Sequence, residues 1–278
     1  MEAIFDRISH MLIERGLDCF SPIRLSDCKI IKEYLLEKAG ISSNEGTAIM
    51  IAVPYMVNDG FDGNISEYAK ARDYHLFFAS LFNDILPDLR REFPEYSFIG
   101  FADHSPIDEI NAAALAGLGI IGTNGLLITE KYSSFVFVGE IITNAIAECE
   151  KHKIKLCEDC GLCRSSCPTG CDKLGCLSAV TQKKGELTNE EKELIVSHRS
   201  AWGCDICQKV CPHTKKAIAC GSVYSPIPFF KKKRIPHITY DMIEKMSEAD
   251  FKERAYSWRG KAVLLRNLKL LEQTGENE

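Results

Sequence analysis

Four cysteines followed by a proline form the most chemically specific feature of the sequence. Cys157, Cys160, Cys163 and Cys167 precede Pro168, which gives the spacing C-x2-C-x2-C-x3-C-P. Bacterial ferredoxins use this spacing because three thiolates of a tight loop hold one cubane, while the fourth thiolate reaches a second cluster. The run therefore predicts 4Fe-4S chemistry, which moves single electrons.

A second cysteine group lies further along the chain. Cys204, Cys207 and Cys211 precede Pro212 with the spacing C-x2-C-x3-C-P, one cysteine short of the first run. If Cys211 crosses back to complete the first cluster, the second cluster has Cys204, Cys207 and Cys167 as ligands. One further ligand is then required.

Cys176, in the segment GCLSAV, is the best candidate for this ligand. Cys171 is its competitor, and Cys149 and Cys220 are less suited by their distance along the chain. Paired C-x2-C motifs also bind zinc, but three cysteines in a row and two Cys-Pro endings are ferredoxin features. We therefore expect two iron-sulfur clusters, with Fe as the metal.

Composition agrees with metal ligation in a reducing compartment. Eleven of the thirteen cysteines lie between positions 149 and 220, and disulfides are rare in the cytoplasm. The N-terminal sequence lacks the basic start, apolar stretch and cleavage site of a signal peptide, and no segment has 18 consecutive apolar residues. We expect a cytoplasmic protein of formal net charge −5 that does not enter a membrane.

The residues before the cysteines have the pattern of a mixed α/β region. Helices are expected at about 1–15 and 27–39, the second with Ser26 as its N-cap and Gly40 as its stop. The apolar run TAIMIAVP (47–54) predicts a strand that is buried on both faces. A sheet should therefore lie inside this region.

Asp103 is expected at a corner between a strand and a helix. The strand is YSFIGFAD (96–103), and Ser105 is the expected N-cap of an Ala-rich helix with Pro106 first and Asp108 third. Gly117 should end this helix. A carboxyl group at such a corner is available for chemistry at the edge of a sheet.

The remaining segments complete the expected order of elements. Residues 65–93 have helical spacing, with Pro87 marking a break or the first turn of a second helix. GLGIIGTNG (117–125) reads as a glycine-rich turn, SFVFVGEIIT (134–143) as a strand, and 240–274 as helical. We divide the chain into an α/β domain (1–150), a cysteine-rich domain (151–222) and a helical tail (223–278).

Several segments together resemble the epoxyqueuosine reductase family, which uses cobalamin and iron-sulfur clusters in the last step of queuosine synthesis on tRNA. Besides both cysteine motifs, the matching segments are YAKARDYH (68–75), ADHSP (102–106), AGLGIIGTNGLLIT (116–129), SSFVFVGEIIT (133–143), CLSAVTQKKG (176–185) and WGCDICQKVCP (202–212). The resemblance covers roughly residues 47–268.

The resemblance implies a fold class and two sets of cluster ligands. The fold class is α/β (α+β), with a nitroreductase-like cobalamin-binding domain followed by a ferredoxin-like domain that carries two 4Fe-4S clusters. One cluster would be held by Cys157, Cys160, Cys163 and Cys211. The other would be held by Cys167, Cys176, Cys204 and Cys207. Electrons would come from an external low-potential donor.

The resemblance also implies roles for single residues. Asp103 matches the family's proton donor, and we expect its carboxyl to be buried with a raised pKa. Lys184 would approach tRNA phosphates, while His75 of RDYH has the pattern of a structural histidine rather than a ligand contact. The cobalamin contacts would be Asn124, Leu127, Val138, Gln182, Asp205 and Ile206.

Three departures from the family pattern bear on the substrate. Ile110 stands where the family has a basic residue, Thr123 replaces a lysine, and the chain ends without the C-terminal helical-repeat domain of longer members. The main prediction is a monomeric oxidoreductase that acts on tRNA. A reductase of a smaller substrate and a non-catalytic electron-transfer protein are the alternatives.

Overall fold

The structure is a computed structural model that describes residues 2–172 and 175–275. It is a mixed α/β structure of two compact units. The first unit holds the described residues up to Tyr55, together with His75–Asp159 and Lys216–Ile227. The second holds Met56–Tyr74, Cys160–Lys215 and the described residues from Pro228 onward. Met1 of the predicted first helix and the end of the predicted tail lie outside the described residues.

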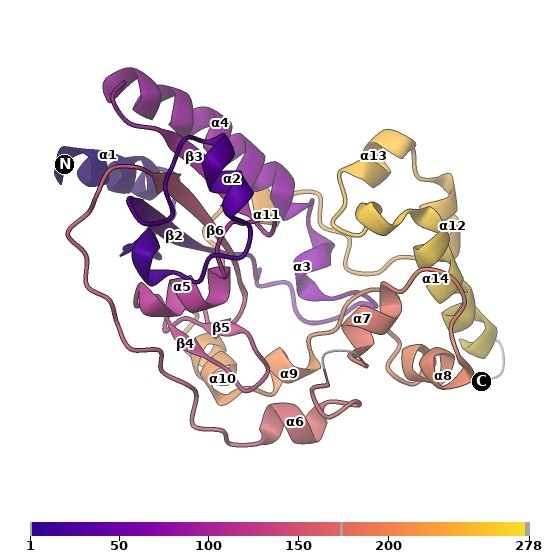
Figure 1. Cartoon of the computed structure of the whole chain (residues 1–278). Coiled ribbons are helices and arrows are strands. Elements are labelled where there is room, and N and C mark those ends of the chain that lie inside the picture. The colour runs from indigo at the N-terminus through magenta and orange to yellow at the C-terminus, as the bar shows by residue number, and fades with distance from the viewer. Residues whose placement is uncertain (1, 173–174, 276–278) are drawn as a thin grey trace. The chain divides into compact units, whose positions relative to one another are not determined.

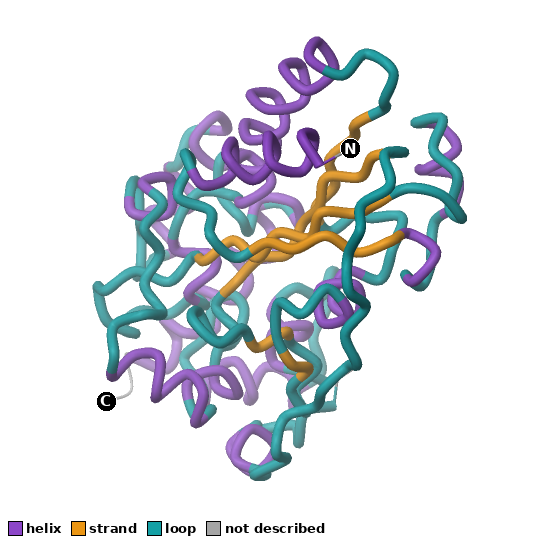
Figure 2. The backbone as a smooth tube through the Cα atoms, turned by 90° about the vertical axis from the view of Figure 1, so that its left-hand side faces the viewer, coloured by secondary structure: helices purple, strands orange, loops and turns teal. Residues whose placement is uncertain are grey.

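A four-stranded sheet forms the centre of the first unit (Figures 1 and 2). Its order is β1 (Phe20–Arg24), β2 (Thr47–Pro54), β6 (Val136–Thr143) and β3 (Phe98–Ala102), and every neighbouring pair is antiparallel. The three predicted strands are confirmed, whereas β1 was not predicted. Every residue of β2 is buried, as its apolar run indicated.

Helices cover both faces of this sheet, which explains why its central strands are apolar throughout. On one face, the alanines of α5 (Glu109–Leu115) join the core beneath α2 (Glu33–Lys38). On the other face, α4 (Tyr74–Glu92) packs so closely that a Cβ at Gly100 or Gly139 would meet one of its phenylalanine rings. An ion pair between Arg7 and Glu92 joins α1 (Glu2–Ile13) to α4.

The glycine-rich segment forms a small hairpin in the same unit. Strands β4 (Ile120–Ile121) and β5 (Leu127–Ile128) pair antiparallel, and the turn between them contains Thr123 and Asn124. Gly125 has a φ of 79°, a conformation that glycine adopts without strain. The predicted glycine turn is confirmed.

Three predicted helix boundaries were wrong. The segment expected as one helix from 27 to 39 contains a short 3₁₀ turn (Leu25–Asp27) and α2 only. Helix α4 runs through Pro87 without a break. Helix α5 starts at Glu109, and Asp108, not Ser105, is its N-cap, since the Asp108 carboxylate accepts the Asn111 N–H. Gly117 follows the end of α5 with a φ of 82°.

The second unit is built from short helices. They are α3 (Glu67–Lys70), α6 (Leu162–Ser166), α7 (Leu177–Thr181), α8 (Asn189–Ser197), α9 (Ile206–Lys209), α11 (Pro228–Lys231), α12 (Tyr240–Lys245), α13 (Glu248–Lys252), a 3₁₀ turn (Ser257–Arg259) and α14 (Lys261–Gly275), while α10 (Pro212–Ala219) spans the boundary at Lys215. Trp202 and Tyr256 are fully buried in its core. The described helices include none with the length and hydrophobicity to cross a bilayer.

A buried ionic network supports the second cysteine loop within this unit. Glu67 is 1% exposed and forms ion pairs with Lys70 and Arg234, and Arg234 also binds Asp59. The Glu67 N–H donates to the carboxylate of Asp205 at 2.7 Å. These bonds hold the segment that contains Asp205 against α3.

Candidate functional site

Asp103 lies directly after β3, at the predicted corner. Its φ of 66° is unusual for a residue other than glycine, and its side chain is 71% exposed. The Oδ2 atom lies 3.7 Å from Nε2 of His75. The neighbouring His75 lowers the pKa of Asp103, against a smaller opposing effect of burial. The expected buried carboxyl with a raised pKa is therefore wrong for this structure.

His75 stands in the first turn of α4, and half of its side chain is exposed. It faces the Asp103 carboxylate, a partner that satisfies the ring and also lies at the candidate site. On the other side of Asp103, His104 contacts Lys32 Nζ and Tyr34 Oη, each at 3.2 Å. The charges of His75, Lys32 and His104 therefore all act on the Asp103 carboxylate.

One end of the sheet is less covered than the other. Val136, Phe137 and Val138 at the start of β6 are half-buried, while the rest of the strand is buried. Because Gly139 pairs with Ala102 in the ladder, this half-covered end is also the end at which Asp103 follows β3. The strand register thus places a carboxylate and an apolar strand surface at the same edge.

The β4–β5 hairpin carries two of the predicted cofactor contacts, and its turn contacts Cys157. The Asn124 side chain accepts the Leu126 N–H at 3.3 Å, while the Leu127 side chain is 2% exposed and belongs to the core. Both the N–H and the hydroxyl of Thr123 lie 3.3 Å from Sγ of Cys157. The hydroxyl also donates to the Asp159 carboxylate at 2.9 Å, so the Thr123 N–H is the group in position to stabilise a thiolate at Cys157.

A pair of carboxyl groups lies behind Asp103, and our sequence interpretation missed it. The Asp103 N–H donates to Oε1 of Glu109 at 3.0 Å, and the Glu109 carboxyl is hydrogen-bonded to that of Glu140. Glu140 is fully buried on β6, where the Ser105 hydroxyl donates to it. The available signal was a glutamate inside the apolar strand SFVFVGEIIT, because a charged group is rarely buried without a partner.

Several predicted cluster ligands of the second unit lie near one another. Burial, followed by the charges of Asp205, Cys207 and Cys176, raises the pKa of the Cys204 thiol to about 12. Helix α6, which contains Cys163, packs against α9, which contains Cys207. The Cys171 thiol donates to the carbonyl of Cys163 at 3.3 Å. Cys171 thus has a hydrogen-bonding role of its own.

The thiols fit iron-sulfur ligation by chemistry and number. No disulfide joins any of the thirteen cysteines, all of which lie among the described residues, and eleven of them lie in the segment that contains both motifs. Within residues 2–172 and 175–275, no three His, Cys, Asp or Glu side chains converge as the ligands of a single metal ion do. A cubane needs a wider cage than a single ion, because each thiolate binds a different iron.

The other predicted contacts of the second unit differ in exposure. Asp205 is buried, and burial raises its pKa to about 6 in spite of the hydrogen bond from Glu67. Ile206 is half-buried at the start of α9, and the Gln182 amide donates to Ser178. Lys184 is exposed. Asp205 therefore has a structural role, as the acceptor of the Glu67 N–H, and the predicted cofactor contact would be a second role.

Arg266 of α14 supports the segment that carries Lys184. Its Nη1 donates to the carbonyls of Lys183 and Gly185, at 2.8 Å and 2.5 Å. These are the two residues that flank Lys184 in the chain. The lysine side chain is therefore presented to solvent from an anchored backbone.

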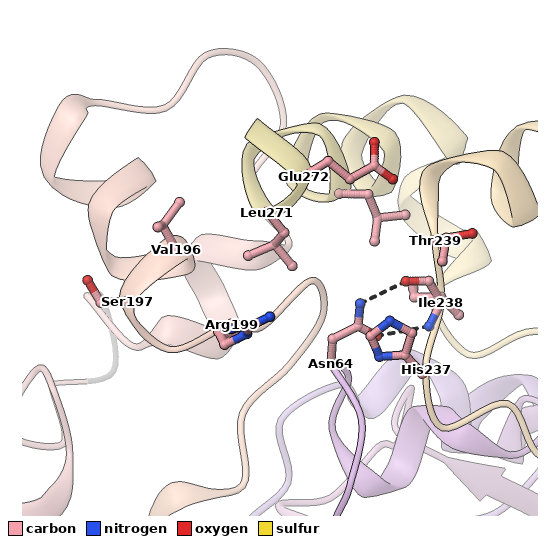
Figure 3. A pocket seen from close by; sticks show the side chains of 10 residues that line it. Asn64, Val196, Ser197, Arg199, His237, Ile238, Thr239, Leu271 and Glu272 are labelled. Carbon is pink, nitrogen blue, oxygen red and sulfur yellow. Dashed lines mark hydrogen bonds between the residues drawn. The ribbon is translucent and has the colours of Figure 1, made fainter. Parts of the chain in front are cut away.

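A cavity of about 420 Å³ lies elsewhere in the second unit, between α8, α14 and the segment 237–239 (Figure 3). Asn64 anchors this segment by a pair of hydrogen bonds with the backbone of Ile238. Arg199, His237 and Glu272 line the cavity with apolar residues of α14. None of its lining residues is one of the predicted site residues, so the cavity is no part of the candidate site.

Comparison with known proteins decides the family. No family model matches the chain. An epoxyqueuosine reductase of Gloeobacter violaceus is 31% identical over 218 residues, which are 74% of this chain and 68% of that protein. The chain belongs to the epoxyqueuosine reductase family. The predicted family is thereby confirmed, and with it, at the level of the family, the predicted class of oxidoreductase.

Other members of the epoxyqueuosine reductase family are matched over less of their length. The enzyme of Lactococcus garvieae is 30% identical over 220 residues, and that of Listeria monocytogenes is 31% identical over 204 residues. The chain spans 60% and 53% of these two relatives. Membership of the family therefore does not by itself assign their whole activity to this chain.

Solved epoxyqueuosine reductase structures share the fold. The enzyme of Streptococcus thermophilus has a TM-score of 0.75 at 24% identity, with 96% of this chain and 80% of that chain covered. A structure with an epoxyqueuosine-modified tRNA-Tyr stem loop has a TM-score of 0.73 at 21% identity. A Bacillus subtilis structure, with a TM-score of 0.71, has an aspartate-bearing catalytic loop swung out of the active site. The predicted mixed α/β fold class is confirmed.

Proposed function

We propose that this chain is a cobalamin- and iron-sulfur-dependent reductase that converts epoxyqueuosine to queuosine in tRNA. Family membership supports the reaction, and the observation that carries most weight is Asp103, exposed at the edge of the sheet and facing His75. Loss of an epoxide oxygen as water takes two electrons and two protons. The chain must therefore supply an electron path and at least one proton donor.

The two 4Fe-4S clusters would form the electron path from an external low-potential donor. We assign one cluster to Cys157, Cys160, Cys163 and Cys211, and the other to Cys167, Cys176, Cys204 and Cys207. The electrostatic interaction of Cys176 and Cys207 with Cys204 supports the second set, while Cys171 interacts in the same way with Cys163, Cys167 and Cys207 and stays the competing ligand. We also propose that residues 1–150 form a nitroreductase-like domain and 151–222 a ferredoxin-like domain, with 223–278 as a helical tail.

The cobalamin contacts would come from the half-covered edge of the sheet and the loops predicted to join it. When bound, cobalamin supplies the low-potential cobalt chemistry that opens the epoxide. Val138 would offer an apolar strand surface and Asn124 a polar group, while Leu127 would contribute through its backbone because its side chain is buried. Gln182, Asp205 and Ile206 complete the proposed set.

Asp103 would deliver one of the two protons. Because the neighbouring His75 keeps its pKa low, Asp103 is ionised at neutral pH before the substrate arrives. We propose that a protonated His75, whose Nε2 lies 3.7 Å away, recharges the carboxyl. The catalytic loop of the Bacillus subtilis relative, which is named by its aspartate, supports a catalytic role for a loop of this kind.

The tRNA would be held in part by Lys184, whose exposed ammonium suits a phosphate contact. The relative solved with an epoxyqueuosine-modified stem loop supports this substrate. We propose that the enzyme acts in the cytoplasm and as a monomer. A smaller substrate is the second candidate. It is favoured by Ile110, whose side chain packs against the core where the family has a basic residue.

The test is anaerobic reconstitution with iron, sulfide and cobalamin, followed by a reductant and tRNA that carries epoxyqueuosine. We expect queuosine in the digested tRNA, and tRNA binding that weakens steeply as salt increases. Bound cofactors without conversion, together with salt-insensitive tRNA binding, would exclude the tRNA reaction and favour a smaller substrate.

Thr123 should tune the cluster that Cys157 helps to hold. The Thr123 hydroxyl lies 3.3 Å from Sγ of Cys157 and donates to the Asp159 carboxylate at 2.9 Å. Hydrogen bonds to a ligand sulfur stabilise the reduced cluster, so Thr123→Val should lower its reduction potential. The expected shift is below about 40 mV, the equivalent of one full hydrogen bond of about 1 kcal/mol, because the hydroxyl proton is shared with Asp159. An EPR-monitored redox titration measures it, and Thr123→Ser, which keeps the hydroxyl, is the matched control. Equal potentials in Thr123→Val and wild type would contradict the contact.

A further inference from the structure

The carboxyl pair behind Asp103 contains a buried oxygen that has no donor among the described residues. Glu140 is fully buried, and its neighbours across the sheet are Met50 and Phe101, which offer no polar side chain. One of its oxygens accepts from the Ser105 hydroxyl, and among the described residues no hydroxyl or N–H donates to Oε2. The hydrogen-bonded neighbour is the Glu109 carboxyl, so a proton on one carboxyl satisfies both groups.

The surrounding charges also favour one proton on the pair. Burial is the largest cause that raises the pKa of Glu109, to about 7, and the charge of Asp103 raises it further, against Lys32, which lowers it. Burial and then the charge of Glu109 raise the pKa of Glu140 well above its ordinary value. The Cys28 thiol also senses the charge of Glu140, and it is neutral at this pH because burial raises its pKa to about 12. Two adjacent buried carboxylates cannot both be ionised without strong repulsion.

We propose that Glu109 and Glu140 share one proton and are a positioning pair for Asp103, an inference that rests on the proton-donor role proposed for Asp103. The φ of 66° at Asp103 is unfavourable for an L-residue and needs support from a neighbour. The bond from the Asp103 N–H to Glu109 gives this support. Loss of the shared proton would drive Glu109, the less buried carboxyl, toward water and release the turn.

The first test compares Glu109→Gln with Glu109→Ala in the reconstituted full chain. Glutamine imitates a protonated carboxyl, because it can accept from the Asp103 N–H and donate to Glu140. Wild-type conversion should therefore hold as Glu109 ionises near pH 7 and fall only where the pH is high enough to remove the shared proton from Glu140, whereas this fall should be absent in Glu109→Gln. Glu109→Ala should lower kcat roughly tenfold at every pH with KM little changed. Glu95→Gln, on the exposed surface of the same unit, should keep the wild-type profile.

The second test does not depend on turnover. Amide exchange at Asp103, corrected for its intrinsic rate, should be roughly five- to tenfold faster in Glu109→Ala than in wild type, the effect of one hydrogen bond. Glu109→Gln should restore protection. Infrared spectra of ¹³C-glutamate-labelled protein should show a protonated carboxyl at neutral pH that Glu140→Gln removes. If the chain converts no epoxyqueuosine, the exchange and infrared results still decide the pair.

Two outcomes would overturn the proposal. One is an infrared spectrum without a protonated glutamate at neutral pH. The other is an Asp103 amide whose protection is the same in wild type and Glu109→Ala. A failure of the Asp103→Asn test described below, with the infrared band present, would instead overturn the function assigned to Asp103 and leave the shared proton in place.

Discussion

Asp103→Asn is expected to lower single-turnover conversion of epoxyqueuosine by about 100- to 10,000-fold, the usual contribution of a positioned acid. Asparagine keeps the shape of the side chain but has no carboxyl proton to donate. Because the Asp103 side chain is mostly exposed, the substitution should leave the fold and the tRNA affinity almost unchanged. The loss should therefore be in kcat rather than in KM.

Mass spectrometry of nucleosides from the digested tRNA measures this conversion. The matched control is Asp88→Asn, which removes a carboxylate from the surface of α4, where its ion pair with Arg91 is exposed. This control should convert at the wild-type rate. Conversion by Asp103→Asn within a few fold of wild type would show that the proton comes from another group or from water.

The sequence allowed prediction of those parts of the fold that rest on local patterns. The strands at 47–54, 96–103 and 134–143 are recognisable because helices cover both faces of the sheet, so their residues are almost continuously apolar. The corner at Asp103 follows from a strand that ends immediately before helix-starting residues. In each case the signal lies within about ten residues of the feature.

The wrong boundaries have tertiary causes. The expected helix at 27–39 loses its first half because Ile30 pairs with Ile107, and the Pro106 carbonyl accepts the N–H groups of Ile31 and Lys32. Pro87 does not break α4, since the buried Ile85, Leu86 and Leu89 hold the helix against the sheet. Contacts between distant segments outweighed local propensity.

The candidate site was predictable by residue type but not by pairing. Asp103 was selected, but its lowered pKa depends on His75, which comes from a different element. The Glu109–Glu140 pair depends on strand β6 placing Glu140 beneath the start of α5. A sequence names such residues, but only the fold shows which of them share a proton.

Cys176→Ala is expected to remove one cluster and to reduce conversion below detection. The thiol lies near Cys204, and a cubane with only three thiolates is labile, so about half of the iron and sulfide should be lost on reconstitution. Without this cluster, the electron path is interrupted. Iron and sulfide analysis, with EPR of the reduced protein, measures the loss separately from activity.

Cys171→Ala is the matched control, because this cysteine competes with Cys176 for the same assignment. The Cys171 thiol donates to the Cys163 carbonyl, so it already has a partner in the protein. The variant should keep the iron and sulfide of wild type. If Cys171→Ala loses a cluster and Cys176→Ala keeps both, the fourth ligand is Cys171 and the assigned ligand set is wrong. A loss in both variants would mean that the Cys171 hydrogen bond is needed to shape the loop that holds Cys163. Wild-type iron content in Cys171→Ser, which keeps a donor but no thiol, would then show that Cys171 is not a ligand.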